Sequence, residues 1–130
     1  MTEQERKELI EKRDNSGLNP EIKKLNAGTW IINAERTGDD KAAVGGCWKN
    51  YWQIFALQDL PTKCPFCGEP LSENEIDGCH IKIEGPIIGK VAKSWSLKKY
   101  IISGHHKCNT SIDGECQAKI AITAVEAIEK

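Results

Sequence analysis

Two short motifs place four metal-binding side chains in pairs along this chain of 130 residues. Cys64-Pro-Phe-Cys67 comes first, and His105-His-Lys-Cys108 follows much later. Each motif has the spacing that lets one tight turn present two ligands to one ion, and four cysteine or histidine ligands complete a closed tetrahedral Zn²⁺ site. The spacing therefore predicts a structural zinc site made by Cys64, Cys67, His105 and Cys108. His106 is the alternative histidine ligand, although its spacing to Cys108 fits less well.

The first cysteine pair has two other interpretations. A Cys-x-x-Cys pair at a helix N-terminus can act as a redox dithiol, because the helix dipole lowers the pKa of the thiol. Gly68 and Pro70 follow directly here, and both disfavour a helix at that point. A disulfide framework is the third interpretation, but residues 1–13 are charged and lack the apolar stretch of an export signal. We therefore expect a reducing, cytoplasmic location, where paired cysteines more often bind metal.

The length of the chain suits one domain. Apolar residues make up 39% of the sequence, which is lean but adequate when a bound metal contributes to folding. The uninterrupted apolar stretches are short, so no membrane-spanning segment is expected. We predict an N-terminal segment, residues 1–44, of helices and a strand packed on a zinc-binding unit, residues 45–130, the two forming one compact unit.

Charge is unevenly distributed although the formal net charge is only -1. Residues 80–112 contain six lysines and one glutamate, whereas residues 68–79 contain four acidic residues and no basic one. The basic segment is interpreted either as a solvated loop or as a face that contacts nucleic-acid phosphates. The lysines concerned are Lys82, Lys90, Lys93, Lys98, Lys99 and Lys107.

Local signals predict several elements outside the motifs. Thr2 and Glu5 have the spacing of a capping box, which predicts a charged helix over residues 3–14. Pro20 suits the first position of a second short helix that would end near Asn26. A strand is expected over residues 29–33. At the C-terminus a helix is expected over residues 123–129, although alternation before it also permits a strand.

Aromatic spacing and the segment between the two motifs complete the fold prediction. Trp48, Trp52 and Phe55 lie at helical spacing and predict one buried helix face. Residues 77–83 and 95–102 read as two strands, and a short helix should follow Cys108. In a treble-clef zinc finger, a tight turn with the first ligand pair, called a knuckle, is followed by a β-hairpin, the second ligand pair and a helix. The same order is expected here, so the predicted class is α+β with a zinc-stabilised treble-clef core. The remaining cysteines, expected to be small buried hydrophobic residues, are Cys47, Cys79 and Cys116.

Three stretches together resemble HNH (His-Me finger) endonucleases. They are Cys64-x-x-Cys67-Gly68, then Asp77-Gly78-Cys79-His80-Ile81, then residues 100–109 with the sequence YIISGHHKCN. A closer similarity is to small bacterial and phage HNH-like proteins, which have a Gly-x-Trp-x-x-aromatic-Trp box like residues 46–52 here. The resemblance covers residues 45–112 and implies a ββα core flanked by zinc-ligand pairs.

The resemblance also implies roles for individual residues. His80 would activate water for attack on a phosphodiester, as a neutral imidazole can do near pH 7. Asn109 would help to hold a catalytic Mg²⁺ or Mn²⁺ ion, with Asp77 assisting. Tyr100 stands where the family has an asparagine that orients the histidine, which is a departure from the pattern. The structural alternative for His80 is a buried strand histidine or a further zinc ligand beside Cys79.

Three functional hypotheses follow. The first is a metal-dependent nuclease that cleaves DNA or RNA. The second is a non-catalytic zinc module that binds nucleic acid or a protein partner, which the departure at Tyr100 and the net charge favour. The third is an accessory protein of a phage or mobile element, for example an inhibitor of a host enzyme, which the resemblance alone suggests.

Overall fold

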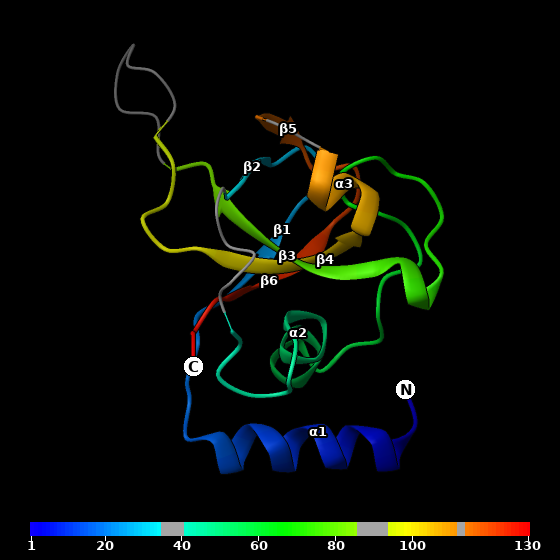
Figure 1. The fold of residues 1–130 in the computed structure, drawn as a ribbon, viewed down its shortest axis with the longest axis vertical. Coiled ribbons are helices and arrows are strands. Elements are labelled where there is room, and N and C mark those ends of the chain that lie inside the picture. The colour runs from blue at the N-terminus through cyan, green and yellow to red at the C-terminus, as the bar shows by residue number, and fades with distance from the viewer. Residues whose placement is uncertain (35–40, 86–93, 112–113) are drawn as a thin grey trace.

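A six-stranded antiparallel sheet forms the centre of the computed structural model, which describes residues 1–34, 41–85, 94–111 and 114–130 (Figure 1). The order across the sheet is β1-β6-β4-β3-β2-β5. The chain is thus mixed α/β, with a curled sheet and, within the described ranges, three α-helices. The strands are β1 (Ile22–Leu25), β2 (Trp30–Asn33), β3 (Ile76–Ile83), β4 (Tyr100–His105), β5 (Glu115–Gln117) and β6 (Ile122–Glu126).

The hairpin of β3 and β4 is the longest ladder of the sheet, running from the pair Ile76 and His105 to the pair Ile81 and Tyr100. The strand predicted over residues 77–83 is confirmed. The strand predicted to begin at Trp95 begins instead at Tyr100, and Trp95 makes only an isolated bridge to Glu84. Because side chains alternate along a strand, β3 divides its residues between two differently covered faces of the sheet.

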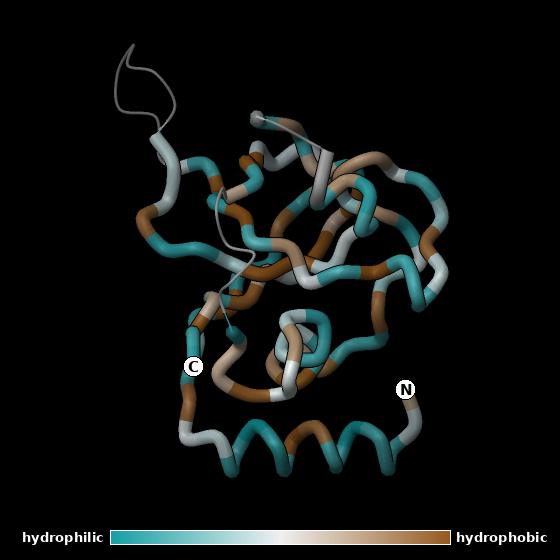
Figure 2. The backbone as a smooth tube through the Cα atoms, viewed as in Figure 1, coloured by the Kyte–Doolittle hydropathy of each residue, from teal (hydrophilic) through white to brown (hydrophobic). Residues whose placement is uncertain are grey.

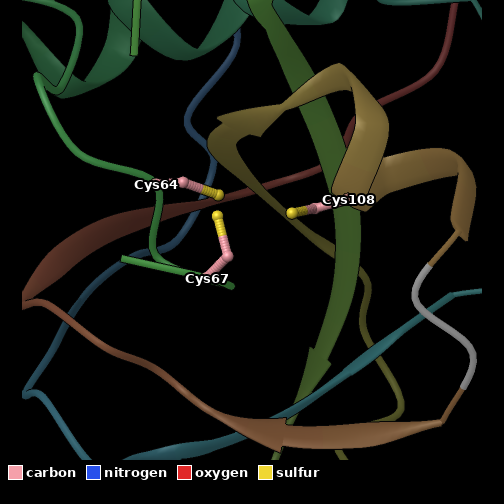
Figure 3. Close-up of side chains that lie close together, drawn as sticks. All are labelled: Cys64, Cys67 and Cys108. Carbon is pink, nitrogen blue, oxygen red and sulfur yellow. The ribbon is translucent and has the colours of Figure 1, made fainter. Parts of the chain in front are cut away.

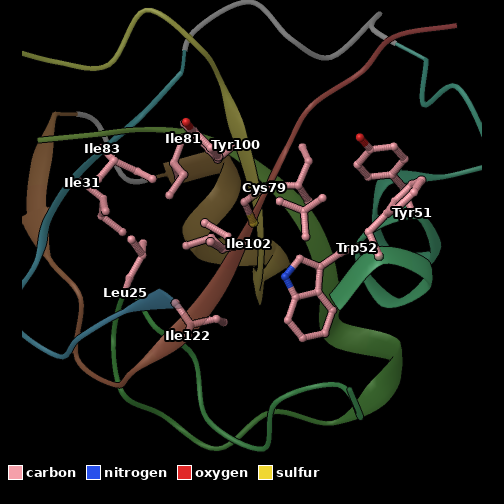
Figure 4. Close-up of a cluster of buried hydrophobic side chains, with 14 of the residues drawn as sticks. Leu25, Ile31, Tyr51, Trp52, Cys79, Ile81, Ile83, Tyr100, Ile102 and Ile122 are labelled. Atoms are coloured by element: carbon pink, nitrogen blue, oxygen red, sulfur yellow. The ribbon is translucent and has the colours of Figure 1, made fainter. Parts of the chain in front are cut away.

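One face of the sheet is covered by α2 (Trp48–Ala56). Of the three aromatic residues predicted to be buried, Trp52 and Phe55 are buried, together with Tyr51 and Ile54, whereas Trp48 is half-buried. The Trp52 indole N–H donates to the carbonyl of Thr123 at 2.8 Å, so its polar atom is satisfied within the core. Figure 4 shows the Trp52 ring among the isoleucine side chains that the strands contribute.

The N-terminal helix α1 (Glu3–Ser16) packs on α2 rather than on the sheet (Figure 1). Thr2 accepts a hydrogen bond from the backbone N–H of Glu5 at 3.1 Å, as the capping-box pattern predicts, and Gly17 ends the helix with a φ of 69°. The helix has no buried residue, and Figure 2 shows it mostly hydrophilic. Its contact with the core is made through the partly buried Leu9.

Two predicted helices are wrong. The helix expected from Pro20 to Asn26 is strand β1, and the helix expected over residues 123–129 is strand β6. These two strands pair with each other, from Ile22 with Val125 to Leu25 with Ile122. The short β5 was not predicted, and residues 35–40 lie outside the described residues. Residues before position 44 therefore supply two strands to the central sheet.

The opposite face of the sheet is covered by the segment that holds the first cysteine pair and by α3 (His106–Ser111) (Figure 1). A side chain at Gly104 of β4 would meet the Phe66 ring at 2.8 Å and the Cys79 sulfur at 3.4 Å. Cys79, Ile81 and Ile83 of β3 therefore face the cysteine side, whereas Gly78 and His80 face α2.

Replacing Gly78 with alanine is expected to destabilise the protein by about 2 kcal/mol, within the usual cost of overpacking a core. A Cβ atom there would lie 2.4 Å from the backbone carbon of Trp48 and 2.6 Å from the backbone nitrogen of Lys49. Backbone atoms cannot rotate away, so α2 would have to move from β3. Urea unfolding of both proteins measures the difference, and equal unfolding free energies would contradict this close approach.

Candidate metal centre

The loop around the first cysteine pair has the shape of a metal knuckle. The Cys64 N–H donates to the carbonyl of Glu69 at 2.9 Å, and the Gly68 N–H donates to the carbonyl of Cys64 at 2.8 Å. Gly68 has a φ of 76°, a left-handed conformation that favours glycine. No helix follows Cys67 in this described stretch, so the helix dipole that a redox dithiol would use is absent there.

A third sulfur comes from α3. The Sγ atoms of Cys64, Cys67 and Cys108 all lie within 4.8 Å of one another, and Figure 3 shows the three side chains converging. With Zn–S bonds of about 2.3 Å, tetrahedral geometry separates two sulfurs by roughly 3.8 Å, so small movements would close this group on one Zn²⁺ ion. Cys64 and Cys108 are buried, while Cys67 lies at the surface. The donor set suits a soft or borderline cation such as Zn²⁺.

The thiols of Cys67 and Cys108 differ in how readily they ionise. Burial opposes ionisation of Cys67, but the backbone N–H of Glu69 and the thiols of Cys108 and Cys64 donate to its sulfur and hold its pKa below the ordinary value. Burial, followed by its interactions with Cys67 and Cys64, raises the pKa of Cys108 to about 12. Accumulating three thiolates here therefore requires a compensating positive charge, which a divalent ion would supply.

Zinc binding is expected to release at least about one proton per ion near neutral pH. The reason is that Cys108, with a pKa of about 12, is protonated until the metal displaces its proton. The sign follows directly: zinc affinity should rise with pH and fall as protons compete for sulfur. Calorimetric titration in buffers of different ionisation enthalpy measures the proton count, and an enthalpy independent of the buffer would contradict this prediction.

The two histidines beside Cys108 direct their rings elsewhere. The backbone N–H of His105 donates to the Cys64 sulfur at 3.3 Å, but its ring accepts from the Lys107 N–H at 3.2 Å and lies 3.2 Å from a Glu75 carboxylate oxygen. His106, the alternative ligand, contacts Asp77 through Nδ1 at 2.5 Å. The structure thus brings together three of the four predicted zinc ligands, with the backbone of the fourth against the sulfur group.

Two of the three predicted catalytic residues are in contact. The Asn109 side-chain amide donates to the Asp77 carboxylate at 3.3 Å, and the same carboxylate oxygen contacts His106. The backbone carbonyl of Asn109 accepts a hydrogen bond from the Asn33 amide at 3.0 Å. Sequence reasoning did not anticipate the contact between Asp77 and His106, because it depends on how α3 lies against β3.

His80 lies on the other face of the sheet. Its side chain is 4% exposed and stacks edge-on against the Trp48 ring, with centroids 4.6 Å apart and an angle of 80°. Asp77 and His80 are three residues apart on β3, and an odd separation along a strand sends two side chains to opposite faces. The structure therefore does not bring His80 together with Asp77 and Asn109. That outcome could have been predicted from the spacing alone.

The predicted basic residues do not form a single group. Lys98 makes ion pairs with Glu21 at 3.1 Å and Glu126 at 3.6 Å, and these contacts raise its pKa. Lys82 and Lys99 line a pocket at the end of the β3/β4 hairpin. Lys107 belongs to α3, in the segment of the third cysteine. The other two lysines, Lys90 and Lys93, lie outside the described residues.

The other cysteines have varied surroundings. Cys79 is buried, as expected, and burial raises the pKa of its thiol well above the ordinary value. Cys116 is half-buried. The prediction that Cys47 is buried is wrong, because it caps the start of α2 at the surface.

Comparisons of this chain with protein-family models, with curated proteins and with solved structures found no match. The assignment of the site therefore depends on the geometry of its own residues. Within the part of the chain that the structure describes, no helix has the length and apolar character needed to cross a membrane.

Proposed function

We propose that the protein is a zinc-binding module whose cysteine centre has a structural role. The observation that carries the proposal is the group of three sulfurs, from Cys64, Cys67 and Cys108, all within 4.8 Å of one another. These residues belong to two segments that are far apart in sequence. A bound Zn²⁺ ion would therefore link the knuckle to the start of α3.

The order of elements supports a treble-clef arrangement around this ion. The knuckle precedes the β3/β4 hairpin, and α3 follows the hairpin directly with Cys108 in it. α3 contains six residues, which is too few for a helix to be stable without tertiary support. Coordination of Cys108 would hold α3 against the sheet, so metal binding and local folding would be linked.

His105 is our proposed fourth ligand. Its backbone N–H is 3.3 Å from the Cys64 sulfur, so its Cα is already beside the centre. Rotation of the side chain would turn one ring nitrogen toward the sulfurs and complete a Cys₃His set, which is a common structural zinc site. The Glu75 carboxylate could then accept a hydrogen bond from the other ring nitrogen, as carboxylates often do for zinc-bound histidines.

Metal stoichiometry and affinity test the structural-zinc proposal. Elemental analysis of protein purified under reducing conditions should give about one zinc per chain. His105→Ala should weaken zinc binding about tenfold or more in competition with a chromophoric chelator, whereas the neighbouring variant His106→Ala should retain the wild-type affinity. Absence of zinc from the reduced, folded protein would refute the proposal. Equal affinities of the His105→Ala variant and the wild type would refute only the fourth ligand.

A nuclease of HNH type is the second candidate, and the contact between Asp77 and Asn109 is the observation that favours it. These two side chains could share a divalent ion beside the zinc module. The position of His80 is unfavourable, because a general base must come within hydrogen-bond reach of the attacking water. For this reason we place the non-catalytic module first, with nucleic acid or a protein as its partner.

Cleavage of supercoiled plasmid in Mg²⁺ or Mn²⁺ separates the two candidates. The non-catalytic module should give no cleavage that depends on the protein. A nuclease using the proposed residues should lose cleavage in the Asn109→Ala and His80→Ala variants while their zinc content stays at about one per chain. Equal cleavage by the wild type and both variants would indicate a contaminating enzyme.

A further inference from the structure

A pocket of about 430 Å³ lies at the end of the β3/β4 hairpin that is opposite to α3. Among the described residues that line it are two lysines, Lys82 and Lys99, and two apolar residues, Trp95 and Ile32. Its volume is within the range of pockets that bind small ligands. The pocket is separate from the cysteine centre. Lys99 lies at the pocket and His105 lies at the cysteine centre, and the extended strand β4 between them spans about 20 Å.

The two lysines are neighbours across the hairpin. β3 and β4 pair Ile81 with Tyr100, so Lys82 and Lys99 occupy the next positions on the two strands. Both side chains are half-buried, and neither forms an ion pair with a carboxylate of the described residues. Glu84 directly follows β3 and Glu115 is the first residue of β5, but neither of them lines the pocket. Two adjacent ammonium groups without such a partner favour binding of an anion.

Hydrogen bonds on both sides of Trp95 hold its backbone in place. The Gly85 N–H donates to the carbonyl of Ser94 at 2.7 Å, and the Ser96 N–H donates to the carbonyl of Ile83 at 2.8 Å. The Ser96 hydroxyl accepts from the Ile83 N–H at 3.0 Å. These bonds fix the backbone on both sides of Trp95, so an aromatic ligand would bind to a ring whose backbone is already ordered. Ile32, opposite Lys82 in the sheet, adds apolar surface.

We propose that this pocket binds a nucleoside phosphate, with its base stacked on Trp95 and its phosphate held by Lys82 and Lys99. Phosphate alone would not use the indole, and a neutral aromatic compound would leave both ammonium groups unpaired. A nucleotide satisfies both features in one molecule, because bases stack on aromatic side chains and lysines bind phosphate. A free nucleotide and one unit of a single strand share this chemistry. The proposal goes beyond the zinc-module function and does not depend on the metal.

Nuclear magnetic resonance of ¹⁵N-labelled, folded protein tests the pocket with four separate probes. These probes are adenosine monophosphate, adenosine, inorganic phosphate and a short single-stranded oligothymidylate. Adenosine monophosphate should bind saturably and shift the indole N–H resonance of Trp95, while adenosine and inorganic phosphate should each bind at least about tenfold more weakly. If the oligothymidylate saturates at much lower concentration than the mononucleotide, the natural source is a strand; otherwise it is a free nucleotide.

Variants distinguish this pocket from general attraction to lysine. The double variant Lys82→Gln/Lys99→Gln and the single variant Trp95→Ala should each lower the affinity about tenfold or more. The control Lys7→Gln/Lys24→Gln removes the same charge from exposed positions on α1 and β1 and should bind as the wild type does. Unchanged unfolding midpoints would show that the variants remain folded. Binding of neither adenosine monophosphate nor the oligothymidylate, or an equal loss in the control, would overturn the proposal. Zinc content, measured on the same samples, reports separately on the metal centre.

Discussion

Replacing Cys64 with serine is expected to abolish stoichiometric zinc binding and to destabilise the protein by on the order of 5 kcal/mol. Cys64 is fully buried and is the member of the sulfur group that also accepts the His105 backbone N–H. Its loss would leave the ion without the ligand that joins the knuckle to β4. Because small domains have unfolding free energies of about 5–15 kcal/mol, a large fraction of the variant should be unfolded.

Zinc analysis and circular dichroism during chemical unfolding measure the two effects of Cys64→Ser. The matched control is Cys47→Ser, which makes the same chemical change at an exposed position that caps α2. Serine is a favourable N-cap residue, so this control should keep its zinc and be as stable as the wild type or slightly more stable. A Cys64→Ser variant with full zinc content would contradict the assignment of this sulfur to the metal centre.

Elements whose signals are local were predictable from the sequence. The start of α1 is determined by a hydrogen bond between Thr2 and Glu5, three residues apart, and its end by Gly17. The inward face of α2 follows from the spacing of Trp52 and Phe55 along one helix. In both cases the interactions that define the element lie within it or are visible in its own periodicity.

Strands β1 and β6 were mistaken for helices because each is stabilised chiefly by the other. Pro20 suits the start of a helix, but the four residues from Ile22 pair instead with β6. β6 lies between β1 and β4 and is buried on both faces, so its residues 122–125 form an uninterrupted buried run rather than an alternating one. Such a run cannot be distinguished from a buried helix by periodicity. Both helix predictions failed because the pairing of β1 with β6 joins segments far apart in the sequence and leaves no signal within either segment.

The sequence was enough to predict the three cysteine ligands of the candidate site, but not the direction in which the His105 ring points. The spacing of the cysteines was enough to bring Cys64, Cys67 and Cys108 together. The ring of His105 was not predictable, since it depends on Glu75 and on the Lys107 N–H, neither of which the ligand motif contains. The placement of His80 away from Asp77 was predictable, because the two residues are three positions apart and therefore lie on opposite faces of a strand.

Replacing Trp52 with alanine is expected to lower the unfolding free energy by about 3–5 kcal/mol, the usual cost of truncating a buried tryptophan. The side chain is 1% exposed, and its indole N–H donates to the carbonyl of Thr123 in β6, so the change would create a cavity between α2 and the sheet and remove this hydrogen bond. Trp95→Ala is the matched control: Trp95 is half-buried at the end of the β3/β4 hairpin, and its loss should cost about 1 kcal/mol or less. Urea unfolding followed by circular dichroism compares the two variants. An unchanged midpoint for Trp52→Ala would contradict its place in the core, whereas the expected contrast would assign one tryptophan to stability and leave the other available for binding.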